Sequence, residues 1–310
     1  MLKKFSALAL TLLLGASTLL FACGDTEDSS TPDETSVTSS VEESSEAPSY
    51  SSLNEALSSA TGTCELKIGD LTLETGFGSF VSLGSETLEE AVVDGLAKDG
   101  RTKAEITAIG GGQSAVRGKN GAKLSFKNIV FYDDSMDYED RLFAYLEFSG
   151  TLRFENCDFK CHIFFKDSTN VEFVNCTFKS SESDRYAVWV GDGTATFTNC
   201  SFTGYRGLKI HEEGTWDIDR ITLTGCTFEN LTKKPGIAIG DIVVDPANTF
   251  ITVTDCVFED CQPWDSQGSV TKEGIDGFYE SDTLTSTIGW SQSGNTVDGF
   301  DVSDDDICYK

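Results

Sequence analysis

The chain has 310 residues, enough for one large or two ordinary domains, and its 21 Phe supply ample apolar material for a core. Lys and Arg total 23 against 51 Asp and Glu, and the resulting net charge of -28 excludes nucleic acid as a partner, since nucleic-acid binding needs a basic surface. The two histidines, His162 and His211, are too few for a histidine-rich metal centre and make a Ser-His-Asp site a poor candidate.

The N-terminus has the pattern of a targeting signal. Lys3 and Lys4 precede an apolar run from Phe5 to Phe21, which is short for a spanning helix and has no basic residues after it. The run ends in Leu20-Phe21-Ala22-Cys23-Gly24, which resembles the lipobox of bacterial lipoproteins. The resemblance implies that residues 1–22 are a signal peptide and that Cys23 carries the lipid. The protein would then be anchored on the extracytoplasmic face of the cell membrane or outer membrane. An uncleaved anchor and an ordinary secretory signal are the alternatives.

Residues 23–50 are expected to form a disordered tether behind the lipid. The segment consists mainly of Ser, Thr, Asp and Glu, with Pro32 and Pro48 and almost nothing to bury. Such a composition cannot offset the entropy of ordering. As a flexible coil it reaches about 30 Å, enough to hold a folded domain clear of the membrane.

An eight-residue motif occurs six times between residues 124 and 258, with apolar residues at positions one, three, six and eight. Successive sixth positions are 28, 19, 24, 26 and 30 residues apart, a scale that is typical of solenoids. The six segments are Leu124–Phe131, Leu152–Phe159, Val171–Phe178, Ala195–Phe202, Ile221–Phe228 and Ile251–Phe258.

The pattern inside the motif predicts two short strands that meet at a bend. Each apolar pair alternates with polar residues, which is strand periodicity. Between the pairs the alternation slips by one residue, and Asn, Gly or Asp stands at the slip, as at Asn156 and Gly225. These residue types tolerate the left-handed backbone conformation. Both apolar pairs can therefore point into one core.

The motif resembles the repeat of right-handed parallel β-helices in the pectate-lyase-like group of folds. The resemblance implies an all-β solenoid over residues 104–261, with Ile106–Gly118 as an early coil. It assigns residues 51–103 to an N-terminal cap and a first coil, with a short amphipathic cap helix from Thr87 to Gly100, because the first coil needs cover for its edge. Residues 262–310 are expected to form atypical last coils and a C-terminal cap, or else a separate domain.

The cysteines divide into a repeated set and four others besides Cys23. The repeated set occupies the inward sixth position and consists of Cys157, Cys176, Cys200, Cys226 and Cys256. We expect these to be buried thiols, because neighbours in a parallel stack point the same way and fit the disulfide torsion poorly. Cys161 and Cys261 lie outside this register, and Cys64 and Cys308 lie near opposite chain ends. A bridge between Cys261 and Cys308 is the first candidate for a disulfide. Within the repeated set the short paired spacings of a metal site are absent, so no metal ligands are predicted.

Catalytic motifs of the fold group are sparse. Polygalacturonase-like hydrolases carry Asn-Thr-Asp, an Asp pair, Gly-His-Gly and Arg-x-Lys, but neither the first nor the third occurs here. The pair Asp133-Asp134 is expected to be a solvated loop. Lyases use a Lys or Arg base beside a calcium-bound uronate, and Arg185, Arg206 and Lys209 form a candidate basic cluster on neighbouring coils. Their alternative role is ordinary surface charge.

Aromatic residues between the motifs are the candidates for glycan stacking, namely Trp189, Trp216 and Tyr205, because a flat ring can stack on a sugar. They could equally pack on the solenoid wall. The acidic run from Asp301 to Asp306 could offer oxygen ligands to calcium, although it lacks the spacing and glycine of a defined calcium loop. No other cofactor is expected.

Three functions are consistent with this pattern. The first is non-catalytic binding of a polysaccharide or surface protein by a membrane-anchored solenoid. The second is a carbohydrate-active enzyme, either a polysaccharide lyase or a glycoside hydrolase. The third is an envelope scaffold without a small ligand. The missing catalytic motifs favour binding.

Overall fold

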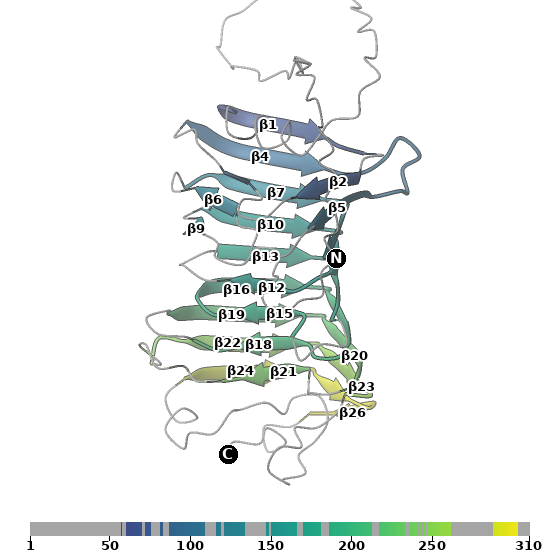
Figure 1. Cartoon of the computed structure of the whole chain (residues 1–310). Coiled ribbons are helices and arrows are strands. Elements are labelled where there is room, and N and C mark those ends of the chain that lie inside the picture. Colours follow the sequence, from purple (N-terminus) through teal and green to yellow (C-terminus); the bar gives the residue numbers. More distant parts are fainter. Residues whose placement is uncertain are drawn as a thin grey trace, which may run out of the picture.

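The computed structural model describes residues 57, 60–69, 72–75, 81–82, 87–108, 116–118, 121–133, 147–148, 150–165, 170–180, 186–212, 217–232, 236–240, 242, 245, 247–261 and 288–302. The predicted signal peptide, Cys23 and the predicted tether lie outside these residues. Within the described residues the named elements are all strands, and Figure 1 shows them stacked in layers along one axis. None of the described segments is a helix long and apolar enough to cross a membrane.

Two long sheets run the length of the stack. The first sheet has nine parallel strands, in an order that takes one strand from each successive coil. Its strands are β1 (Gly62–Lys67), β4 (Leu88–Asp94), β7 (Lys123–Lys127), β10 (Thr151–Glu155), β13 (Asn170–Val174), β16 (Gly193–Thr198), β19 (Ile218–Thr224), β22 (Phe250–Thr254) and β24 (Gly289–Ser293).

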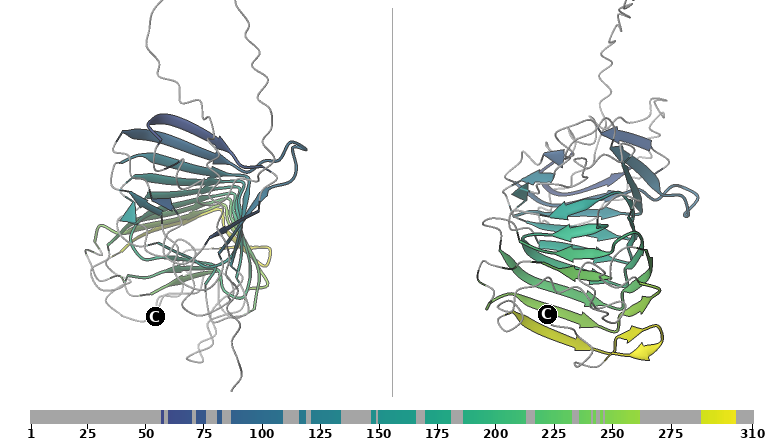
Figure 2. Two further views of the ribbon diagram at one scale, coloured as in Figure 1. Left: turned by 45° about the horizontal axis from the view of Figure 1, so that its top comes forward. Right: turned by 60° about the horizontal axis from the view of Figure 1, so that its bottom comes forward.

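The second sheet has ten strands and is parallel until its final pair, β25 and β26, which is antiparallel. Its strands are β2 (Thr72–Thr75), β5 (Ala104–Ala108), β8 (Ile129–Asp133), β11 (Asp158–Lys160), β14 (Thr177–Lys179), β17 (Ser201–Gly204), β20 (Thr227–Leu231), β23 (Val257–Glu259), β25 (Thr296–Val297) and β26 (Phe300–Asp301). Figure 2 shows the sharp angle at which the first and second sheets meet.

Two smaller parallel sheets complete the solenoid. The third sheet, which carries the candidate site, has four strands: β12 (Ile163–Phe165), β15 (Val188–Val190), β18 (Leu208–Ile210) and β21 (Ile237–Ile239). The fourth sheet has three strands: β3 (Val81–Ser82), β6 (Val116–Gly118) and β9 (Glu147–Phe148). Strands that are next to each other in a sheet come from successive coils, which is the arrangement of a parallel β-helix.

The predicted inward positions form the core. Phe154 pairs with Phe126 on one side and with Phe173 on the other, and all three side chains are fully buried. Their rings stack at centroid distances of 5.5 and 5.1 Å. A second row of rings runs along the second sheet, where Phe202 and Phe228 stack at 4.5 Å. Each buried Phe contributes about 1.5–3 kcal/mol, so these rows dominate the stability of the solenoid.

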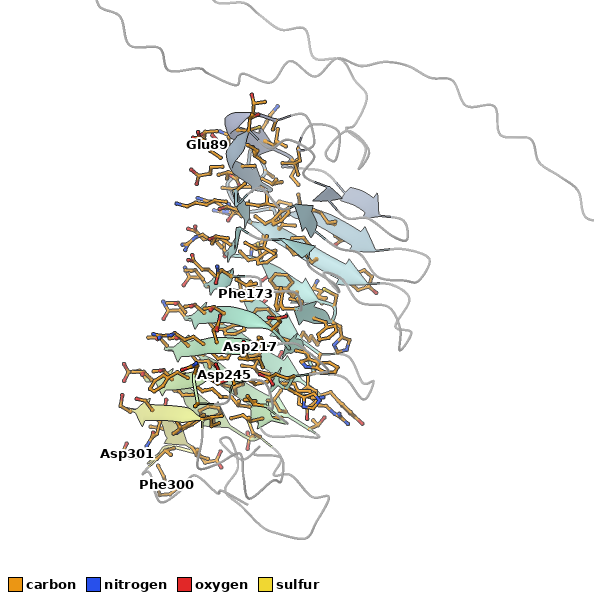
Figure 3. The ribbon with its side chains drawn as sticks, turned by 90° about the vertical axis from the view of Figure 1, so that its left-hand side faces the viewer. Glu89, Phe173, Asp217, Asp245, Phe300 and Asp301 are labelled. Carbon is orange, nitrogen blue, oxygen red and sulfur yellow. The ribbon has the colours of Figure 1, made fainter. Side chains whose placement is uncertain are left out.

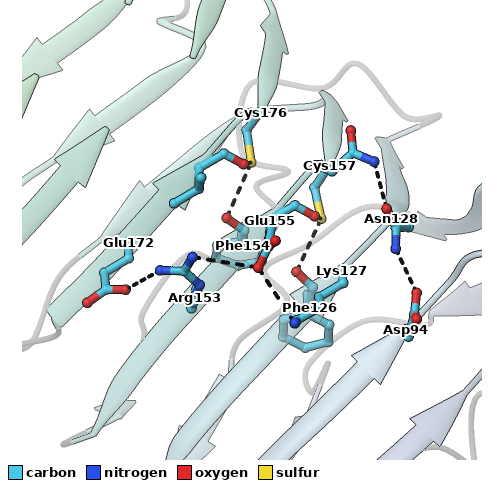
Figure 4. Close-up of polar contacts among 12 residues, drawn as sticks. Asp94, Phe126, Lys127, Asn128, Arg153, Phe154, Glu155, Cys157, Glu172 and Cys176 are labelled. Atoms are coloured by element: carbon cyan, nitrogen blue, oxygen red, sulfur yellow. Dashed lines mark hydrogen bonds and ion pairs between the residues drawn. The ribbon is translucent and has the colours of Figure 1, made fainter. Parts of the chain in front are cut away.

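The slip in the motif is a left-handed bend, as predicted. The backbone φ is 54° at Asn156 and 63° at Gly225, and the equivalent residues of the other coils have similar values. The side chains at the bend link successive coils: Asn156 Nδ2 donates to Asn128 Oδ1 at 2.6 Å, and Asn128 Nδ2 donates to Asp94 Oδ1 at 2.8 Å (Figure 4). Asn is therefore favoured at the bend for two reasons: it tolerates positive φ, and its side-chain amide can both donate and accept hydrogen bonds between coils.

The predicted cap helix from Thr87 to Gly100 is wrong, because residues 88–94 form strand β4, which lies between β1 and β7 in the first sheet. The pairing with β1 shifts after Leu88, so that Glu89 is a bulge residue, and its side chain is exposed (Figure 3). The bulge lets Leu88 and Ala91 both point inward although they are three residues apart. Buried positions that are three residues apart are also typical of one face of a helix. The solenoid consequently begins at β1, within the segment 51–103 to which the cap and the first coil were assigned.

The five repeated cysteines are buried free thiols, as predicted. Each points inward beside the bend, and Cys157 Sγ donates to the carbonyl of Phe126 in the preceding coil at 3.5 Å (Figure 4). Burial raises the pKa of Cys157 well above its usual value. Cys261 is also buried and donates to the carbonyl of Phe228 at 3.4 Å, whereas Cys308, its predicted disulfide partner, lies outside the described residues.

One further coil follows the last motif. Strand β24 continues the first sheet, and β25 turns back into β26 through Asp298 and Gly299, which both have positive φ. This hairpin ends the second sheet with an antiparallel strand. Of the predicted calcium-binding run, Asp301 lies in β26, whereas residues 303–306 lie outside the described residues.

Candidate functional site

The outward side of the third sheet carries two of the residues that the sequence predicts for binding, Trp189 and Lys209. In each of its strands the first and third residues point into the core, as Val188 and Val190 do in β15. The central residues therefore point outward, and the strand register aligns them in one column. From β12 to β21 the column consists of Phe164, Trp189, Lys209 and Ala238.

Trp189 lies between the neighbouring strands' side chains. The Phe164 ring from β12 is 4.5 Å from the Trp189 ring centroid, and Lys209 Nζ from β18 lies 3.8 Å from the same centroid. Because β12 and β18 flank β15, these contacts come from opposite sides of the indole. A cation over an aromatic face is attracted by the ring's quadrupole. Trp189 and Lys209 thus form one cation–aromatic unit rather than a bare ring and a separate charge.

His211 extends this unit toward the end of β18. Trp189 Nε1 donates to the carbonyl of His211 at 2.9 Å, and the two rings lie 5.7 Å apart. Gly240 lies in the next coil, and a Cβ at this position would overlap the His211 imidazole. The glycine therefore leaves room for this imidazole beside the column. His211 is half-buried.

Arg206 lies at the corner that leads into β18. Its guanidinium carbon is 5.3 Å from the ring centroid of Tyr186, which is a second cation–aromatic contact. Buried Ser180 fixes this corner, because its Oγ accepts from the backbone N–H groups of Tyr205 and Arg206 at 2.6 and 2.8 Å. Arg206 and Lys209 thus sit on successive stretches of one coil, each against a different aromatic ring.

The predicted site residues are only partly brought together. Trp189 and Lys209 are in contact. Arg206 lies three residues before Lys209, at the corner that leads into β18. Tyr205 is half-buried and contributes its backbone to the Ser180 corner. Arg185 and Trp216 lie outside the described residues, as does Asp134.

Sequence reasoning missed three residues near this column. Phe164 is outside the core cluster yet 2% exposed, because it packs against Trp189. Its sequence neighbours are all apolar, so no alternation marked it as outward. Asp192 and Glu212 follow β15 and β18 at equivalent positions, and both are buried. Glu212 Oε1 accepts from the Ile218 amide at 3.0 Å, which ties one of these carboxylates to the backbone.

The acidic surface elsewhere is dense but carries no metal arrangement among the described residues. No group of three or more His, Cys, Asp or Glu there is placed to hold a metal ion. Asp217 lies before β19, and burial, together with the charges of Asp219 and Asp245, raises the pKa of its carboxyl (Figure 3). At exposed Asp99, hydrogen bonds from the Thr102 hydroxyl and nearby amides lower the pKa.

Comparison with known families decides the class of the solenoid. The family model described as the right-handed β-helix region matches residues 78–215 and 160–289, together well over half of the chain. The chain belongs to the right-handed β-helix family. No curated protein and no solved structure matches it. The parallel pairing of strands from successive coils in this right-handed β-helix agrees with that family.

Proposed function

We propose that this right-handed β-helix protein is an extracytoplasmic lipoprotein, anchored through Cys23, that binds a glycan or another surface partner without cleaving it. The observation that carries the proposal is the outward column of the third sheet. There Phe164, Trp189 and Lys209 are in contact across three successive strands, with His211 beside them. Aromatic and cationic groups on rigid strands can hold a ligand without moving.

Two features support binding rather than catalysis at this column. Lys209, the predicted base of a lyase, has its ammonium over the indole of Trp189. A base must be within hydrogen-bond reach of the proton that it removes, and it needs a pKa near the working pH. Two of the four motifs of polygalacturonase-like hydrolases, Asn-Thr-Asp and Gly-His-Gly, are missing from the sequence as well.

One observation favours glycoside hydrolysis as a second candidate. Asp192 and Glu212 are buried carboxylates at equivalent positions of successive coils, next to His211. Hydrolysis of a glycosidic bond uses a pair of carboxyl groups at a controlled separation. The backbone contact of Glu212 Oε1 with Ile218 gives this carboxylate a structural role instead.

A glycan array on the full chain in nonionic detergent, run beside a reducing-sugar assay and an unsaturated-uronate assay, tests the proposal. We expect binding without turnover, and we expect Trp189→Ala to lower the affinity at least tenfold. Tyr132, on the outward side of β8, is exposed to 38%, so Tyr132→Ala is the control that should leave binding unchanged. If the wild type releases reducing ends and Glu212→Gln does not, the proposed function would be hydrolysis instead of binding.

A further inference from the structure

The outward side of the first sheet changes character along the solenoid. In its early coils this surface is charged, and the charges pair with one another. Arg153 Nη1 lies 2.8 Å from Glu172 Oε2, and Lys127 Nζ lies 3.6 Å from Glu155 Oε2 (Figure 4). From β16 onward the pattern is different, and two columns of outward positions carry hydroxyl groups only.

These two columns contain eight hydroxyl side chains on four successive strands. The strand registers place each residue directly beside its counterpart in the next coil. Adjacent residues of a column are therefore about 4.8 Å apart, and the two columns are about 6.7 Å apart along the strands. One column is Thr196, Thr222, Thr252 and Ser291, and the other is Thr198, Thr224, Thr254 and Ser293.

The hydroxyl columns face solvent. Each of the eight side chains is half-buried or exposed, and no side-chain hydrogen bond joins them to the residues that the structure describes. Asp219 and Arg220 stand at the start of β19, outside the two columns. In a protein with a net charge of -28, eight uncharged neighbouring positions are a marked departure from the rest of the composition.

An exposed aromatic ring borders the same columns. Phe250 is the first residue of β22 and is exposed to 39%. Its partner in β24 is Gly289, and a Cβ at Gly289 would overlap the Phe250 ring. The ring thus lies over the glycine on the surface of the sheet, beside Thr252 and Ser291. Glycine is the residue that makes this placement possible.

We propose that this surface, formed by the two hydroxyl columns and Phe250, binds a neutral polysaccharide. Hydroxyl groups both donate and accept, as sugar hydroxyls do, and an aromatic ring can pack against the apolar face of a sugar. The two columns offer a charged polymer no counter-charge, and Arg220, which pairs with Phe250 in the strand register, lies outside them. A protein interface needs an apolar centre that Thr and Ser do not supply, and a second copy would bring another strongly negative molecule. This site is separate from the third sheet and does not depend on the function proposed there.

Native affinity electrophoresis of the full chain in nonionic detergent tests this inference. The gels contain hydroxyethylcellulose, laminarin, soluble starch or galactomannan, and polygalacturonate serves as the charged counterpart. We expect at least one neutral polymer to retard the wild type. Phe250→Ala and Thr252→Glu should each weaken that retardation at least tenfold, and Gly289→Ala should do the same by displacing the ring.

A control variant distinguishes this surface from exposed aromatic rings elsewhere on the solenoid. Tyr132→Ala removes an equally exposed ring from the second sheet and should leave retardation by the neutral polymer unchanged. Thermal melts confirm that each variant is folded. Absence of retardation by all four neutral polymers would overturn the proposal. Retardation that survives Phe250→Ala and Thr252→Glu would overturn it too.

Discussion

At the scale of single residues, neighbours in one strand of the first sheet lie in opposite environments, Phe197 in the core and Thr196 on the outward face. Phe197 is fully buried and stacks on Phe173 at a centroid distance of 4.9 Å. Thr196 is its neighbour in β16, and its side chain lies on the outward face. The strand period of two residues requires this alternation, and one shift in register would exchange the two faces.

The first prediction compares a charge at these two positions. Phe197→Asp should lower the free energy of unfolding by several kcal/mol, because the carboxylate would have no partner in the core. Thr196→Asp should lower it by well under about 1 kcal/mol, because surface substitutions have small effects. Thermal melts of both variants measure the difference. Equal destabilisation would contradict the inward and outward assignment.

At the scale of the elements, the stacking of the coils determines whether the repeated cysteines can form disulfides. Cys157 and Cys176 come from successive coils and project from equivalent positions. Side chains that project in parallel fit the disulfide torsion of roughly 90° poorly. Titration of the denatured protein without reductant should therefore count at least five free thiols. A peptide map that joins Cys176 to Cys200 would contradict this expectation.

The same burial predicts a loss of stability at alkaline pH. Burial keeps Cys157 protonated in the folded state, since its pKa is raised, whereas the thiol of the unfolded chain ionises near pH 8.5. The stabilisation is fully present below that pH and decreases above it, by about 1.4 kcal/mol per pH unit for one thiol. Urea unfolding at pH 7 and 9.5 measures this slope. Cys157→Ala should have a shallower slope, and an unchanged slope would show that other groups cause it.

The sequence predicted those elements whose residues alternate over a full strand. The two apolar pairs and the bend at Asn156 were visible because each coil repeats them. Two features were hidden for physical reasons. The bulge at Glu89 changes the spacing of Leu88 and Ala91 to that of a helix, so the pattern of β4 predicts a cap helix. Strand β12 has three residues, Ile163–Phe165, all apolar and all buried, so it offers no alternation to show that Phe164 faces outward.

The candidate site was predictable in kind but not in geometry. The sequence marks Trp189 as a candidate stacking ring and Lys209 as a candidate base. Their contact depends on the register between β15 and β18, which a segment of variable length separates in the chain. Segment lengths differ from coil to coil, so spacing in the sequence does not fix which outward residues become neighbours.

At the scale of the whole molecule, the proposed lipid anchor at Cys23 would attach a rigid solenoid to a membrane. Cys23→Ala should move the protein from the detergent phase to the aqueous phase in a partitioning experiment, or block its processing, because the acyl chains provide the membrane affinity. Immunoblots of both phases measure the distribution. A variant that is still processed and still enters the detergent phase would contradict the lipoprotein assignment.

The most direct test of binding without cleavage is to measure affinity and turnover on the same polysaccharides, for the wild type and for Lys209→Ala. The substrates are pectin, alginate, chondroitin and xylan, each with and without calcium. Affinity is measured by calorimetry, and turnover by the absorbance of unsaturated uronates and by reducing ends. Binding by a cation–aromatic unit predicts no turnover by the wild type and weaker affinity after Lys209→Ala. Unsaturated uronates that the wild type releases and Lys209→Ala does not would contradict it.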